Sequence, residues 1–348
     1  MRQSTSIAGS AEPAEASAKA EAVLERIGSL ATADPATVRW LLCGSGAPID
    51  AAAPRSPYTV VLDGEARQVW FQDNETTRVL AEERWEELGY EPVPYPWHAA
   101  PPEVSEAETV VAPLRRHLAK TELERYRGAG RDCAAAVVAT LGRLAPAMGE
   151  LDVAAELELQ LRRRGFFVPV ILVAGEQRQR VYRHPLPTGA RLGRHALLAV
   201  TAERAGLYVS MTRIASFGEP PPELSRLVRA AAQVDAAMLA VSRPGTTTGA
   251  VLAAAAKAYQ GVGFPEEWRG HHQGGLTGYR GREVFAVPGE RTALPDSCAV
   301  AWNPSISGGA KSEDTALVTE AGLEVVTRTP ELSELEVGGL VRPAVTVL

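Results

Sequence analysis

The chain has 348 residues, of which 45% are hydrophobic and 22% are charged, which is ordinary for a soluble globular protein. A net charge of −6, spread along the chain, argues against a nucleic-acid partner, because such proteins usually carry a basic face. No apolar run approaches a membrane span, and no signal peptide is recognisable, so we predict a cytoplasmic protein without a membrane partner. Cys43, Cys133 and Cys298 are far apart and form no CxxC pair, which favours reduced thiols over a zinc site.

The first hundred residues predict a small α/β domain. Residues 1–14 are rich in Ala, Ser and Glu and are predicted to be a disordered tail before a domain at 15–110. Gly89 stands at the expected stop position of a helix. In chain order, the predicted elements are a helix at 17–30, strands at 37–42, 58–62 and 68–71, and a helix at 75–88.

A second domain is predicted at 111–348, after a break at 94–102 that is dense in Pro, His and Ala. Paired helices followed by a largely antiparallel sheet indicate an α+β fold. The predicted helices lie at 121–144, 152–165, 221–241 and 247–261. The predicted strands lie at 168–173, 195–201, 206–214, 284–288, 297–303, 315–319 and 323–327.

Three short motifs follow one another along this second domain. They are Arg183-His184-Pro185, the glycine-rich segment 270–276 and Lys311-Ser312-Glu313-Asp314-Thr315. In order and spacing they resemble site motifs of the creatinase, Xaa-Pro dipeptidase and methionine aminopeptidase family. The resemblance covers nearly the whole chain. It implies a pita-bread C-terminal domain with a curved antiparallel sheet and paired helices, preceded by a creatinase-type N-terminal domain.

The resemblance also implies where metal ligands would stand. Family peptidases hold two metal ions with two Asp, one His and two Glu, a donor set that suits Mn, Co or Zn. The matching positions in this chain are Ala199, Ser210, His272, Asn303 and Glu313. Two ligands remain and three negative charges are lost, which would leave two divalent ions undercompensated. We therefore predict a degenerate site without metal or other cofactor.

Creatinase, a member of this family, has the same fold and works without metal. The resemblance of this chain to creatinase implies that His184 is the acid/base. An imidazole suits that role because its ordinary pKa is near neutrality. His271 is interpreted as a loop residue before a glycine turn. The candidate catalytic residues are His184, His272 and Glu313. The candidate substrate-binding residues are Asn303, Tyr279, Ser210, Arg280, Arg282 and Trp302.

These candidates have different expected roles. Asn303 and Tyr279 can donate hydrogen bonds to a carbonyl or an oxyanion, and the two arginines can bind a carboxylate. Plainer interpretations compete with these roles. Trp302 is more often a core residue, Ser210 a small strand residue, and Arg280 and Arg282 solvated side chains.

Three functional hypotheses follow. The first is a metal-independent, creatinase-like hydrolase or lyase that acts on a C–N bond of a small amide, amidine or amino-acid derivative, in a closed polar pocket. The second is a non-catalytic family member that binds a small molecule, a peptide or a protein. The third is an Xaa-Pro metallopeptidase with relocated ligands, and it ranks last because residues 195–217 contain no Asp. The resemblance further implies a short-peptide or small-molecule substrate and a homodimer.

Overall fold

The computed structural model describes residues 12–105 and 107–348. These residues form two compact units, one reaching Glu122 and including Ala205–Leu207, the other containing Leu123–Arg204 and Tyr208–Leu348. The boundary expected at residue 110 lies inside α4 (Glu108–Arg115), which packs against α1 (Glu12–Ile27) and thereby belongs to the first unit. Of the predicted tail, residues 1–11 lie outside the described residues and residues 12–14 are helical.

The first unit contains a four-stranded sheet with the order β1-β2-β3-β4. Its first two pairings are antiparallel and its last is parallel. The strands are β1 (Leu30–Thr32), β2 (Thr59–Leu62), β3 (Arg67–Gln72) and β4 (Glu91–Tyr95). The remaining helical elements are α2 (Pro35–Leu41), α3 (Thr76–Glu82) and the 3₁₀ helices η1 (Asp73–Glu75) and η2 (Trp85–Leu88).

The strand predicted at 37–42 is wrong, because this segment is helix α2. The Asp34 carboxylate accepts a hydrogen bond of 2.8 Å from the Thr37 amide, and Pro35 occupies the first turn. An aspartate cap followed by proline is a strong helix start, and here it outweighs the strand preference of the β-branched residues that follow. The single helix predicted at 75–88 is broken between α3 and η2 at Arg84, which has a φ of 53°.

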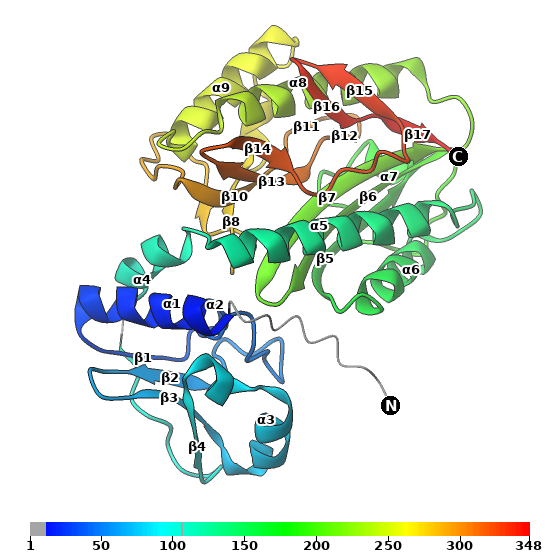
Figure 1. The fold of residues 1–348 in the computed structure, drawn as a ribbon. Helices are drawn as coiled ribbons and strands as arrows, with labels where there is room; N and C mark the ends of the chain where they lie inside the picture. The colour runs from blue at the N-terminus through cyan, green and yellow to red at the C-terminus, as the bar shows by residue number, and fades with distance from the viewer. Residues whose placement is uncertain (1–11, 106) are drawn as a thin grey trace. The chain divides into compact units, whose positions relative to one another are not determined.

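The second unit contains two larger sheets, with the orders β17-β7-β6-β5 and β14-β13-β10-β8-β9 (Figure 1). Its helices are α5 (Lys120–Leu141), α6 (Glu150–Arg162), α7 (Glu176–Gln179), α8 (Pro222–Val241), α9 (Thr248–Gly261) and η3 (Glu267–Arg269). Its strands are β5 (Phe167–Gly175), β6 (His195–Arg204), β7 (Leu207–Ser216), β8 (Gly274–Thr277), β9 (Val284–Phe285), β10 (Ser297–Trp302), β11 (Ser305–Ile306), β12 (Ala310–Lys311), β13 (Asp314–Thr319), β14 (Gly322–Val325), β15 (Glu334–Val337), β16 (Leu340–Pro343) and β17 (Val345–Val347). The α+β class and the long helices of this unit are confirmed.

The register of the central strands brings distant segments together at one end of these strands. Trp302, the last residue of β10, pairs with Gly274 at the start of β8 and with Asp314 at the start of β13. The residues just beyond these pairs are therefore neighbours at the same end of the strands. They are Gln273, Asn303 and Glu313, and the candidate site is built around them.

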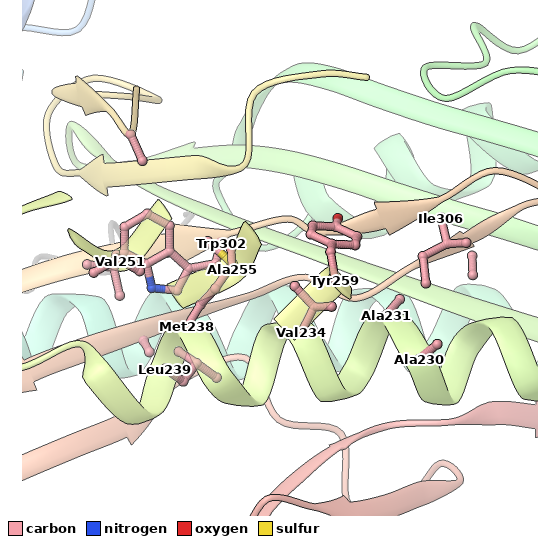
Figure 2. Close-up of a cluster of buried hydrophobic side chains, with 14 of the residues drawn as sticks. Ala230, Ala231, Val234, Met238, Leu239, Val251, Ala255, Tyr259, Trp302 and Ile306 are labelled. Carbon is pink, nitrogen blue, oxygen red and sulfur yellow. The ribbon is translucent and has the colours of Figure 1, made fainter. Parts of the chain in front are cut away.

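The main hydrophobic core of this unit lies under helices α8 and α9, which pack against each other (Figure 1). Figure 2 shows Trp302 and Tyr259 among side chains of α8 and α9. Trp302 is completely buried, and its indole N–H donates to Ser242 Oγ at 2.9 Å. The assignment of Trp302 as a substrate-binding residue is therefore corrected, because no part of its ring reaches the surface.

No helix within the described residues is long and apolar enough to cross a bilayer.

Candidate functional site

Three histidines from two segments meet in the second unit. His184 lies on the loop after α7, and His271 and His272 precede β8. The His184 ring is 6.3 Å from the His272 ring, in a stacked orientation, and 5.6 Å from the His271 ring. The structure thus brings together the two histidines selected from the sequence, and it adds His271, which the sequence analysis interpreted as a loop residue.

A hydrogen-bond chain holds this cluster in place. Arg183 donates to Ser305 Oγ and to Ser307 Oγ, both at 3.0 Å, and it forms an ion pair with Glu267. Ser305 Oγ is also bonded to His271 Nε2 at 2.6 Å. Arg183 therefore fixes the loop that carries His184 relative to the strand that contacts His271.

The segment after the histidines depends on glycine. Gly274 has a φ of +97°, and a Cβ at this position would overlap the carbonyl oxygen of Ala301. Only glycine adopts this conformation without strain and allows the two backbones to approach so closely. The turn positions the His272 ring, whose Nδ1 accepts from the Gly274 amide at 3.3 Å and which packs against Phe285 in a T-shaped arrangement.

Glu313 is buried and surrounded by donors. Its Oε2 accepts from Thr212 Oγ1 at 2.8 Å and pairs with the Lys311 ammonium at 3.0 Å. Its Oε1 pairs with the Arg282 guanidinium at 3.4 Å. Burial acts to raise the pKa of the Glu313 carboxyl, but the charges of Lys311 and Arg282 outweigh it and the net shift is downward. Glu313 is therefore a carboxylate at neutral pH.

Lys311 was not selected from the sequence. Its position two residues before Glu313 was the available signal, because side chains at i and i+2 of an extended strand share one face. The sequence does not indicate that this ion pair is buried, with the Lys311 side chain only 7% exposed.

The three imidazoles are uncharged at neutral pH. Partial loss of hydration to the surrounding protein is the largest cause, and it lowers the pKa of His271 to about 3 and that of His272 to about 4. The pKa of His184 is also lowered, by partial loss of hydration and then by the Lys311 charge. At pH 7 each ring is therefore present as the free base, and the strongly lowered pKa values make His271 and His272 weak proton acceptors.

The folded protein should lose stability as the pH falls below 6.5, because His271 stays neutral when folded and takes up a proton when unfolded. By pH 5.5 this group should cost about 1 kcal/mol of unfolding free energy. His271→Asn should reduce the loss between pH 6.5 and 5.5 by that amount, measured by urea unfolding. Equal losses in both proteins would show that His271 does not titrate as described.

The remaining candidates differ in their surroundings. Asn303 is buried, and its Oδ1 has no hydrogen-bond partner among the described residues. Ser210 is also buried, and its hydroxyl is bonded to Thr201 Oγ1 at 2.9 Å. The Tyr279 hydroxyl accepts from Arg125 at 3.3 Å, and the Arg280 carbonyl accepts from Thr277 Oγ1 at 3.3 Å.

The residues of the predicted closed pocket differ in exposure. His184 and His272 keep solvent-exposed surface, whereas Asn303 and Glu313 are buried at the ends of the central strands. The arrangement is a neutral imidazole cluster at the surface above a buried group of charges.

Residues 124–320 match the model of metallopeptidase family M24. The chain belongs to this family. The predicted family resemblance and the pita-bread fold are thereby confirmed. No curated protein sequence matches the chain.

Several solved structures share the fold of this chain. A dipeptidase PepE from Mycobacterium ulcerans is 20% identical with a TM-score of 0.73, over 92% of this chain and 96% of the other. An Xaa-Pro dipeptidase from Bacillus anthracis is 17% identical with a TM-score of 0.73, over 96% and 100%. The N-terminal domain of FACT complex subunit SPT16 from chickpea is 11% identical with a TM-score of 0.66, over 91% and 95%. At these identities the similarity shows the fold.

The side chains at the positions that the resemblance assigns to metal ligands differ from the five-ligand set of the family peptidases. Among the described residues, no group of three or more His, Cys, Asp or Glu side chains is placed to hold a metal ion. Ala199 and Ser210 supply no carboxylate, and Glu313 already has cationic partners on both oxygens. A carboxylate neutralised in this way attracts a further divalent cation weakly.

Proposed function

We propose that this M24 member hydrolyses a C–N bond of a short peptide or amino-acid derivative without a dinuclear metal centre. The observation that carries the proposal is the pairing of Glu313 with Lys311 and Arg282, since two side-chain cations neutralise the carboxylate that the resemblance assigns to metal. Short peptides are favoured as substrates because structures of similar fold are described as dipeptidases and Xaa-Pro dipeptidases.

His184 is the proposed general base and acid. It removes a proton from water as the water oxygen bonds to the carbonyl carbon, and it returns the proton to the nitrogen as the C–N bond breaks. Its lowered pKa supports the first step, because the free base predominates at pH 7. The proposal assigns to the Asn303 amide and the Arg282 guanidinium the role of donors to the polarised carbonyl oxygen.

A second candidate function is binding without turnover. It is favoured by one observation: among the described residues, none forms a hydrogen bond with the His184 imidazole. Efficient general bases usually have a partner that orients the ring. In this alternative the same residues bind a peptide that is not cleaved.

The deciding experiment combines metal content with peptide cleavage. The protein is incubated with excess Mn²⁺, desalted and analysed by mass spectrometry, and a panel of Xaa-Pro and other dipeptides is assayed with and without a chelator. We expect much less than one metal ion per chain and cleavage that the chelator does not change. Stoichiometric metal with chelator-sensitive cleavage would overturn the proposal, and no cleavage under any condition would leave the binding function.

A further inference from the structure

The proposed base is held in place through its loop, because its ring has no anchor of its own. His184 is exposed, and none of the described residues forms a hydrogen bond with its imidazole. The place of the ring therefore depends on the backbone of residues 176–188, the His184 loop, which begins with α7. The contacts that fix this loop decide where the base lies relative to His271 and His272.

Glu150 joins the two ends of the His184 loop. It lies in the first turn of α6, and its side chain is completely buried. Its Oε1 accepts a hydrogen bond from the Gly175 amide at 2.9 Å, just before the loop. Its Oε2 accepts from the Thr188 amide at 3.0 Å and from the Thr188 hydroxyl at 2.8 Å, at the far end. One carboxylate therefore binds both ends of the loop to the same helix.

Arg178 extends this anchor into the middle of the loop. Its guanidinium forms an ion pair with Glu150 and donates to the Leu186 carbonyl at 3.0 Å. It also lies over the Tyr182 ring, 5.2 Å from the ring centroid. Tyr182 is two residues before His184 and Leu186 is two residues after it. Glu150 and Arg178 together therefore hold the chain on both sides of the proposed base.

The buried charge of Glu150 is not needed to cap α6. Asp152, in the same turn, accepts from the Gly149 amide at 3.1 Å and closes the start of the helix while it remains exposed. A carboxylate is buried at little cost only if hydrogen bonds and an ion pair compensate the lost hydration. The contacts that supply this compensation come from Arg178 and from the two ends of the loop. The burial of Glu150 and the closure of the loop therefore depend on each other.

We infer that Glu150 is a positioning residue for His184, and that Arg178 transmits its effect along the loop. The inference rests on the proposed function, because His184 is the base only in that function. The Glu150 side chain has no solvent-exposed surface, so it cannot touch a bound peptide and acts only through geometry. A displacement of about 1 Å in a reacting group can lower a rate by roughly 10²-fold.

The test replaces Glu150 by glutamine, which keeps the volume of the side chain but turns one acceptor oxygen into an N–H donor. Ala-Pro, or the dipeptide of the panel that is cleaved fastest, is the substrate. We expect kcat to fall by roughly 10- to 100-fold and KM to stay within about twofold, because a displaced base slows the reaction without weakening binding. In the His184→Ala background, Glu150→Gln should not lower the residual rate further, since the group that it displaces is absent. Asp152→Asn, the matched control in the same turn, should keep the wild-type kcat.

A second measurement needs no turnover. The Val181 and Tyr182 amides donate to the Arg178 carbonyl at 3.1 and 3.0 Å, close to the proposed base. Their hydrogen exchange, followed by NMR, should be at least about tenfold faster in Glu150→Gln, because the loop opens more often. The control variant should exchange at the wild-type rate.

Three results would each overturn the inference. They are wild-type kcat in folded Glu150→Gln protein, an equal fall in the His184→Ala background, and unchanged exchange in the loop. If the wild-type protein cleaves no dipeptide, the proposed function fails, and the exchange rates alone decide whether Glu150 positions the loop. If Glu150→Gln does not fold, Arg178→Met takes its place with the same expected results, because this arginine is partly exposed and forms the other half of the ion pair.

Discussion

His184→Ala is expected to lower kcat/KM for any cleaved peptide by roughly 10²- to 10⁴-fold, the usual contribution of a general base. The substitution should leave the fold intact, because His184 is exposed and lies on a loop. Steady-state kinetics measure the first effect, and circular dichroism with urea unfolding measures the second. The wild-type rate should rise with pH through a midpoint below 6.5, since only the neutral ring accepts a proton and its pKa is lowered.

His117→Ala is the matched control, because His117 is an exposed histidine in the first unit. It should retain the wild-type rate. If His184→Ala retained it as well, the acid/base assignment would be wrong, and His272 would be the next residue to test. If the fold were lost together with activity, His184→Gln would separate the chemical role from the structural one.

Arg213→Met should reduce the unfolding free energy by about 3–5 kcal/mol, the usual cost of breaking a buried ion pair. The Arg213 guanidinium is 2% exposed and donates to Asp314 at 2.9 Å, and also to Thr329 Oγ1 and the Thr327 carbonyl, both at 2.7 Å. Methionine fills similar volume but supplies none of these donors. Urea denaturation gives the change from the midpoint and slope.

Arg226→Met is the control for charge removal, because Arg226 pairs with Glu223 at the exposed surface of α8. It should change stability by less than about 0.5 kcal/mol. A similarly small effect for Arg213→Met would mean that the buried pair is dispensable. Since Asp314 is adjacent to Glu313, the Arg213 variant should also bind ligand less tightly at temperatures where it remains folded.

The fold could be predicted because its signals are local and ordered. Helices α5, α6, α8 and α9 have clear periodicity, and the three motifs follow in the order expected for the family. The error at α2 has a local cause too. Its first residues include β-branched side chains, and the capping contact of Asp34 decided the conformation.

The site could be predicted only as a set of positions. Arg183 meets Ser305 across 122 residues of sequence, and Thr212 meets Glu313 across 101. Such contacts depend on strand register, which no local pattern specifies. The same register placed Trp302 in the core and its neighbour Asn303 at the site, a distinction of one residue that follows from the alternation of strand side chains.

Two contacts of the second unit can form only after its C-terminal segment has been synthesised. β17 is the parallel outer neighbour of β7, and Arg342, just before it, bonds to Asp235 and Asp314. During synthesis, Asp235 is made well before Arg342, and β7 has an open edge until residues 345–347 follow. Until residues 342–347 have been made, the nascent unit therefore exposes the edge of β7 and lacks the ion-pair partner of Asp235, and an open strand edge of this kind favours pairing with other chains.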